Sequence, residues 1–237
     1  MRQSQSLGSP LSRIFPSHSK NSGEYDVIDR IASLATSTLA NALDDIGYHD
    51  KVMPGIRTVA AGFRLAGPAV TVKEVSGEFG SFSSDDFRVG AMIDAAAAGD
   101  VIVVDAGGAP CSTWGGMASY AAKLKGVVGL VVDGGVRALE EIMEFGFPVF
   151  ARHMVPTTGR TRLKVEAINE PIVVDGVRVE HGDIIAGDGT GVVCLPRRDA
   201  EKIVGLAEEF ARDDASAMED LEAGLTFSAA MAKYKKI

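Results

Sequence analysis

An arginine follows two glycines at the end of a strongly apolar segment, in the run Asp133-Gly-Gly-Val-Arg137. A guanidinium group presents a rigid fork of donors that matches a carboxylate or a phosphate. Glycines let backbone N–H groups come close to such an anion. The alternative is an arginine held by a nearby aspartate in a loop ion pair, and the spacing alone does not separate the two. Arg137 is therefore a candidate for binding an anionic ligand.

A second candidate lies at the start of the preceding helical segment, in the run Trp114-Gly-Gly-Met117. The exposed N–H groups at a helix N-terminus attract anions through their partial positive charge. The backbone of Gly115 to Ala118 would supply these groups, including Gly116 and Met117. The alternative is an entry turn in which Trp114 only anchors the core. We expect both candidates to lie side by side at one edge of a sheet.

Other motifs for chemistry are weak or missing. The run Gly187-Asp-Gly-Thr-Gly191 lacks the GxxxxGK[ST] order and does not open a helix, so a turn is favoured. The chain has no HExxH, no GxSxG and no GxGxxG after a strand. Cys111 has no recognisable partner for nucleophilic catalysis. The four histidines are far apart in the chain: His18, His49, His153 and His181. We expect His153 to be a hydrogen-bonded surface residue.

The elements that would position both candidates alternate between strand and helix. Buried strands are predicted over 101–105, 127–133 and 148–151, with helices over 117–125 and 138–145 between them. Such an order implies a parallel sheet with right-handed crossovers. Ligands gather at the carboxyl ends of parallel strands. Those ends are the loops after Asp105 and Asp133.

The flanking segments complete an α/β pattern. A strand is predicted over 62–73, with Gly67-Pro68 as a bulge or edge feature, followed by a helix over 87–98. Two helices are expected at the N-terminal side, the first from Tyr25 and the second over 39–46, capped by Thr36 or Ser37. Residues 172–179 read as a hairpin with a type I′ turn at Asp175-Gly176. Short strands (182–185 and 192–196) and a helical region from 199, with Ile203, Leu206 and Phe210 on one face, follow.

Composition places the chain among ordinary globular proteins. It has 237 residues, 46% of them apolar, and a formal net charge of −8, which argues against a surface that neutralises a phosphate backbone. Two cysteines make no disulfide framework. We therefore expect a cytoplasmic protein that binds neither nucleic acid nor a membrane. The expected organisation is a leader over 1–24, one α/β domain over 25–212 and a helical extension over 213–237.

These segments together resemble the RraA-like family. The resemblance rests on Gly99–Gly108 (GDVIVVDAGG), on Trp114-Gly-Gly and on Gly129–Arg137 (GLVVDGGVR). Shorter matches extend it over roughly residues 30 to 200, including 39–43, 62–72, 146–151 and 182–193. The family contains the 4-hydroxy-4-methyl-2-oxoglutarate (HMG) aldolases, which also decarboxylate oxaloacetate, and the regulators of ribonuclease E activity.

The resemblance carries expectations for fold, assembly and site. It implies a swivelling β/β/α domain with a parallel-rich central sheet flanked by helices, assembled as a homotrimer or homohexamer with the active site at a subunit interface. It also implies a Mg²⁺ or Mn²⁺ ion that holds a small 2-oxo acid. In the family's signature an acidic residue is followed, after twenty residues, by Arg-Asp. There the Arg binds substrate, the Asp holds the metal, and the helix-start backbone binds the carboxylate.

This sequence keeps only part of that signature. Arg137 is retained, and Gly115 to Ala118 supply the backbone loop. Gly116 stands where the family has an acid or Asn, and Ala138 stands where it has the metal-binding Asp; Asn41 stands where Asp is common. A hard divalent ion needs oxygen ligands, which Ala138 does not offer. The nearest acids that could replace it are Glu140 and Glu141, although their position predicts side chains directed along the helix.

Three hypotheses about function follow. The leading one is a lyase of aldolase/decarboxylase type that cleaves a small 2-oxo acid to a pyruvate enolate, with Arg137 as the catalytic residue. The second is a non-catalytic or regulatory protein that keeps the family scaffold. The third is a metal-independent enzyme with altered chemistry, such as a tautomerase or a dehydratase, that uses the same anion loop.

Overall fold

The computed structural model describes residues 24–234, and the expected leader therefore lies, but for its last residue, outside the described part of the chain. A single ten-stranded sheet runs through the molecule, in the order β1-β12-β11-β3-β4-β6-β7-β2, with β5 paired to β6 and β8 paired to β3. Its centre, β3-β4-β6-β7, is parallel, and the outer strands are antiparallel. The expected α/β fold with a parallel-rich central sheet is confirmed.

The strands have the following bounds: β1 Val52–Met53, β2 Arg57–Thr58, β3 Leu65–Ser76, β4 Val101–Asp105, β5 Ser112–Trp114, β6 Gly129–Val136, β7 Val149–Met154, β8 Leu163–Ile168, β9 Ile172–Val174, β10 Val177–Val179, β11 Ile184–Gly187 and β12 Val192–Leu195. The strands β9 and β10 form a separate hairpin, whose turn residues Asp175 and Gly176 both have positive φ, as a type I′ turn requires.

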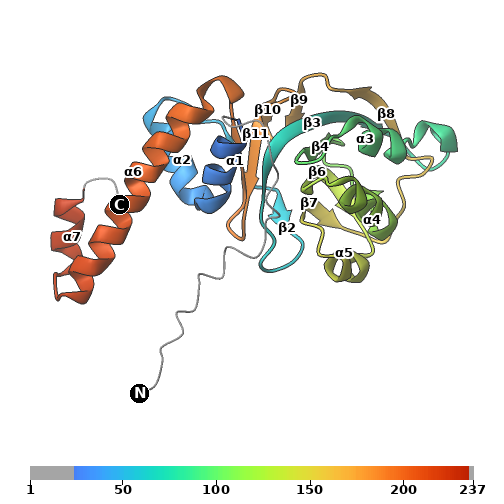
Figure 1. Cartoon of the computed structure of the whole chain (residues 1–237). Helices are drawn as coiled ribbons and strands as arrows, with labels where there is room; N and C mark the ends of the chain where they lie inside the picture. The colour runs from blue at the N-terminus through green and yellow to red at the C-terminus, as the bar shows by residue number, and fades with distance from the viewer. Residues whose placement is uncertain (1–23, 235–237) are drawn as a thin grey trace, which may run out of the picture.

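The helices have the following bounds: α1 Glu24–Ser33, α2 Thr36–Asp45, α3 Val89–Ala95, α4 Gly116–Lys125, α5 Leu139–Phe145, α6 Ala200–Glu222 and α7 Phe227–Lys233, with 3-10 turns at Ser84–Asp86 and Arg197–Asp199. Figure 1 shows α3, α4 and α5 grouped on one side of the sheet and α1, α2 and α6 at its other end. The far end of α6 and α7 extend away from the sheet (Figure 1). Within residues 24–234, each helix is too short or too polar to cross a bilayer.

Three large apolar clusters among the described residues hold these layers together. One lies between the central strands and α3, α4 and α5, and it contains Trp114 and Phe147. A second lies between β11–β12 and the helices α1, α2 and α6, and it includes Ile203 and Phe210. The third lies under the β9–β10 hairpin, on the opposite face of the central strands. Burial on both faces explains why β4 and β6 read as continuous apolar runs.

The first correction to the sequence interpretation concerns Gly134-Gly135. These glycines were expected in a loop after a strand ending at Asp133, but β6 continues to Val136. A Cβ on Gly135 would lie 2.6 Å from the carbonyl oxygen of Cys111. The glycines therefore serve close packing of neighbouring strands and do not form an anion-binding loop.

The second correction concerns Gly67-Pro68, which is neither a bulge nor an edge. Both residues pair with β11 inside β3, while the register shift of this strand lies between Lys73 and Glu74. A Cβ on Gly67 would overlap the carbonyl oxygen of Gly99. Glycine is needed there because another segment of backbone approaches the strand.

The third correction concerns the helix starts. The residue before α2 is Ala35, and neither Thr36 nor Ser37 is its cap. Instead Asp188 accepts hydrogen bonds from the backbone N–H of Thr36 at 2.9 Å and from its hydroxyl group at 2.8 Å. The run Gly187–Gly191 is thus a turn, as expected, and its aspartate satisfies a helix that is distant in sequence. In addition, α3 is shorter than the predicted 87–98, and β5 was expected to be loop.

Candidate functional site

The start of α4 is fixed by a buried tryptophan. Trp114 is 1% exposed and stacks on Phe147 with ring centroids 6.2 Å apart. Its indole N–H donates to the hydroxyl oxygen of Ser119 at 2.9 Å, and that hydroxyl group donates to the carbonyl oxygen of Gly115 at 3.1 Å. Trp114 is therefore a core residue, as the alternative interpretation held. By the same contacts it also fixes the first turn of α4.

The first turn of α4 presents backbone N–H groups without competition from a cap. The capping position is Gly115, which has no side chain that could accept from them. The first turn contains no acidic residue, whereas Lys123 and Lys125 lie in the last turn. The partial positive charge at this end of α4 is thus not neutralised within its own helix.

Arg137 lies against this helix start. It follows β6 directly, and its backbone N–H donates to the carbonyl oxygen of Trp114 at 3.0 Å. Its side chain covers Gly115: a Cβ on Gly115 would lie 3.3 Å from Cγ and 3.6 Å from Nε of Arg137. The structure therefore brings both candidates, Arg137 and the Gly115–Ala118 backbone, to one place. The guanidinium group of Arg137 and the N-terminus of α4 therefore lie side by side.

Ala138 connects this arginine to the next helix with an uncommon backbone. It is the residue before α5, with φ 54° and ψ 52°, in the left-handed region. That conformation costs an alanine about 1 kcal/mol, whereas Asp and Asn adopt it more readily. Backbone strain of this kind concentrates at functional sites, where surrounding structure maintains it.

The first turn of α5 sends a carboxylate onto the first turn of α4. Glu141 is exposed, but its carboxyl oxygen Oε2 lies inside the volume that a Cβ on Gly116 would fill. Its own Cβ would lie 2.6 Å from that added atom. The expectation that this side chain is directed along its helix is thus wrong, because the absence of a side chain at Gly116 leaves room for it.

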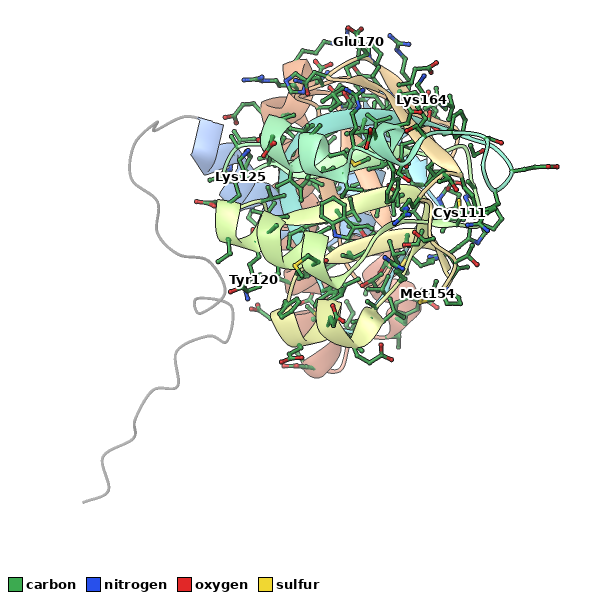
Figure 2. All side chains as sticks on the ribbon, turned by 90° about the vertical axis from the view of Figure 1, so that its right-hand side faces the viewer. Cys111, Tyr120, Lys125, Met154, Lys164 and Glu170 are labelled. Carbon is green, nitrogen blue, oxygen red and sulfur yellow. The ribbon has the colours of Figure 1, made fainter. Side chains whose placement is uncertain are left out.

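A cavity of about 220 Å³ opens on the other side of Arg137. It is lined by residues 136–140, at the turn between β6 and α5, and by residues 154–156 after β7. The α4 start does not line it, so Arg137 stands between the cavity and the helix N-terminus. In Figure 2, Met154 and Cys111 lie on one side of the face formed by α3, α4 and α5, and Lys125 lies on the other. The N-terminal end of α4 therefore faces the side of Met154.

The carboxyl ends of β4 and β6 are occupied by ion pairs. Asp105 accepts from Lys73 at 2.8 Å, and Asp133 accepts from Arg152 at 2.5 Å. Arg152 also pairs with Asp175 of the hairpin turn, and these two carboxylates raise the pKa of its guanidinium. The β9–β10 hairpin thus covers Asp105 and Asp133, whereas Arg137 follows the last residue of β6.

The remaining sequence candidates do not join the site. Cys111 is 6% exposed, and burial raises the pKa of its thiol, which opposes a nucleophilic role. His153 is half-buried, with Nε2 3.1 Å from the carbonyl oxygen of Gly108. Asn41 is exposed on α2.

A buried acid near the site escaped the sequence interpretation. Glu74 is 1% exposed and accepts a hydrogen bond from the hydroxyl group of Thr113 at 2.8 Å, while its Oε2 has no hydrogen-bond partner among the described residues. Burial raises the pKa of Glu74 to about 7. No sequence signal indicated it, because Glu74 lies just beyond the predicted strand 62–73 and the register of β3 shifts between Lys73 and Glu74.

Metal ligands are scarce at this site. Between residues 24 and 234, no three or more His, Cys, Asp or Glu side chains gather in a way that could hold an ion. Gly116 and Ala138 supply no side-chain oxygen, and Arg137 brings a positive charge. A hard divalent ion takes six or more oxygen ligands. Among the described residues, the side chains at this site do not supply three or more such ligands.

Comparison with solved structures agrees with the observed fold. A Pseudomonas syringae protein superposes with a TM-score of 0.78 at 28% identity, covering 87% of this chain and 96% of that one. Streptomyces coelicolor RraAS2, described as an unusual member of the RNase ES inhibitor RraA protein family, gives a TM-score of 0.74 at 25% identity, with 84% and 100% covered.

Sequence relatives give the same result. An uncharacterized protein of Methanocaldococcus jannaschii is 36% identical over 165 residues, which are 67% of this chain and 74% of that protein. A Halalkalibacterium halodurans protein named "Putative 4-hydroxy-4-methyl-2-oxoglutarate aldolase" is 30% identical over 192 residues, with 81% and 86% covered. The family model RraA-like (Aldolase/RraA) matches residues 36–194. The chain is a member of the RraA-like family.

Proposed function

We propose that the protein is a carbon–carbon lyase of aldolase/decarboxylase type that acts on a small 2-oxo acid. The observation that carries the proposal is the position of Arg137, whose side chain covers Gly115 at the uncapped start of α4. Two converging positive groups suit the carboxylate of such an acid. The aldolase names of several relatives agree with this substrate class.

Arg137 and the start of α4 would bind the substrate together, and Arg137 would then stabilise the charge that develops during the reaction. The N–H groups of Gly116 to Ala118 and the guanidinium of Arg137 bind the carboxylate and orient the substrate. When the bond between C3 and C4 breaks, negative charge develops on the oxygen at C2 as an enolate forms. Arg137, which would bind the adjacent carboxylate, would also stabilise that charge, and fixed groups aimed at developing charge lower a barrier effectively.

The family resemblance implies a Mg²⁺ or Mn²⁺ ion at this place. Gly116 and Ala138 provide no ligand, and the carboxylate of Glu141 beside Gly116 does not belong to a group of three ligating side chains among residues 24–234, so the side chains present do not fit such an ion. We therefore assign every step above to groups of this chain.

The absence of acids at positions 116 and 138 favours a second candidate function. Loss of both acids suits a non-catalytic or regulatory member of the family, which binds a keto acid or a protein partner without turnover. A metal-independent enzyme with altered chemistry, such as a tautomerase or a dehydratase, would use the same anion site. The three functions differ in whether pyruvate is released and in whether EDTA abolishes the activity.

We further propose a cytoplasmic homo-oligomer, a trimer or a hexamer, that binds neither nucleic acid nor a membrane. Met117, Tyr120 and Leu124 follow one another along one exposed face of α4, and Met117 is 80% exposed. A second copy that covers this face would bury apolar surface and enclose the start of α4. Light scattering behind a sizing column measures the assembly.

The test of the proposed function is pyruvate release from HMG and from oxaloacetate, each with added Mn²⁺ and with EDTA. Release above the uncatalysed rate supports the lyase, and release that survives EDTA supports a metal-independent one. The absence of release from both substrates, with oxalate still bound in calorimetry, supports the non-catalytic candidate and contradicts the lyase.

A further inference from the structure

We infer that Glu141 is the acid–base residue of the proposed lyase, delivered to the site from α5 through the space that Gly116 leaves open. This inference rests on the proposed function. It concerns a group that the binding site described above does not use.

Two consecutive glycines, Gly115 and Gly116, lie at the start of α4, and each is covered by a charged side chain. The side chain of Arg137 covers Gly115, and the side chain of Glu141 covers Gly116. A guanidinium group and a carboxylate therefore lie over adjacent residues at the start of α4. A ligand carboxylate bound by this helix start and Arg137 would have the carboxylate of Glu141 beside it.

The contact is specific to glycine at this position. A Cβ on Gly116 would overlap Oε2 of Glu141 and would come within 2.6 Å of its Cβ and 2.7 Å of its Cδ. Rotation of the end of the side chain relieves the first overlap but not the second, because the Cβ of Glu141 is fixed by α5. The position of Glu141 thus requires glycine at residue 116, because the Glu141 side chain fills the space of any side chain there.

Glu141 also keeps the solvent access that proton exchange requires. It is exposed, and it belongs to the first turn of α5 together with Glu140. Glu140 lines the cavity beyond Arg137 instead. Of the two acids, only Glu141 contacts the helix start that would hold the substrate.

Cleavage of a 4-hydroxy-2-oxo acid needs one base and one acid, and a single carboxylate can serve as both. The carboxylate of Glu141 takes the proton from the hydroxyl group at C4, and the electron pair of that O–H bond forms the new carbonyl. The bond between C3 and C4 breaks, and its electrons form the enolate of pyruvate. The carboxylic acid of Glu141 then returns the proton to C3, so that one proton is used twice and no co-reactant is needed.

Decarboxylation of oxaloacetate makes a weaker demand on the same residue. Carbon dioxide leaves from C4 without a hydroxyl proton to remove, and only the enolate carbon must be protonated afterwards. Water can supply that proton at an exposed site. A carboxylate that acts as the base therefore matters more for HMG than for oxaloacetate, whereas a purely structural role would affect both substrates alike.

The experiment compares Glu141→Gln with Glu144→Gln, an exposed acid of the same helix. We expect Glu141→Gln to lower kcat for HMG by about 100-fold or more, the ordinary size of general acid–base catalysis. For oxaloacetate we expect a loss of less than about tenfold by the same principle. Glu144→Gln should leave both rates unchanged. Equal losses for both substrates, or no loss, would overturn the inference.

An exchange of the two positions tests the geometry itself. Glu141→Gly should lose HMG cleavage, and Gly116→Asp added to it should restore at least a tenth of the lost rate, because a carboxylate returns to the same volume from α4. No recovery, in a double variant whose Tm equals that of Glu141→Gly, contradicts the assignment.

Failure of the inference and failure of the proposed function give different results. If the wild-type protein decarboxylates oxaloacetate but does not cleave HMG, the proposed lyase function stands. The inference alone is then overturned, because no hydroxyl proton has to be removed by Glu141. Wild-type protein that releases pyruvate from neither substrate overturns both.

Discussion

The carboxylate of Glu141 lies over Gly116, in the volume that any side chain at that position would fill. This contact joins the first turns of α4 and α5, the two helices that follow β5 and β6. Its consequence for stability can be measured without knowledge of the substrate.

Gly116→Ala should destabilise the protein by about 1–3 kcal/mol, the usual cost of overpacking, because the new Cβ meets the Cβ of Glu141. Gly205→Ala is the matched control, since nothing lies within 4 Å of a Cβ at that position in α6. There the substitution should stabilise by up to about 1 kcal/mol through helix propensity. Urea unfolding measures both, and a neutral Gly116→Ala would show that the two helices are not in firm contact.

Ala138→Gly should stabilise the protein by about 0.5–1 kcal/mol, because glycine adopts the left-handed backbone of residue 138 without strain. Ala121→Gly, on the exposed side of α4, should instead destabilise by about 1 kcal/mol. Opposite signs in thermal or urea unfolding are expected from the two substitutions. Destabilisation by both would mean that Ala138 carries no strain.

Glu74 should make the stability of the fold depend on pH. Burial raises its pKa to about 7, above the ordinary value of 4.5, so the folded state binds the proton more tightly than the unfolded state. Its contribution is therefore complete at acid pH and is lost as the pH rises towards 7 and beyond. Between pH 5 and pH 8 this loss amounts to about 2 kcal/mol.

Glu74→Gln should remove that loss, since the amide stays neutral and still accepts from the hydroxyl group of Thr113. Urea unfolding at pH 5 and at pH 8 checks this, with Glu166→Gln, an exposed acid on the neighbouring strand β8, as the control. An unchanged pH dependence in Glu74→Gln would show that Glu74 is already charged at pH 5.

The sequence predicted the centre of the fold well, because the runs of β4 and β6 are apolar throughout and are buried on both faces. It failed where long-range contacts decide local structure. Gly134-Gly135 read as a loop, although the approach of Cys111 and Val155 requires glycine within β6. The cap of α2 comes from Asp188, which no pattern near Thr36 could show.

The candidate site was predictable in one part only. Arg137 and the start of α4 could be paired from the sequence, because each follows one of two neighbouring strands. The contact of Glu141 with Gly116 could not, since it depends on how α5 lies against α4 after the left-handed turn at Ala138. The part-buried ion pair of Arg152 with Asp175 likewise depends on the β9–β10 hairpin, which comes later in the chain.

The most direct test of the central claim is kcat/KM for pyruvate release by Arg137→Ala, measured beside its Tm. Arg178→Ala is the control, because Arg178 is an exposed arginine on β10 that pairs with Glu180. If Arg137 binds the carboxylate and stabilises the enolate, Arg137→Ala lowers kcat/KM by at least about 100-fold while its Tm and the activity of Arg178→Ala stay close to wild type. An Arg137→Ala protein that keeps its kcat/KM within threefold, or that loses activity only as it unfolds, would contradict the account.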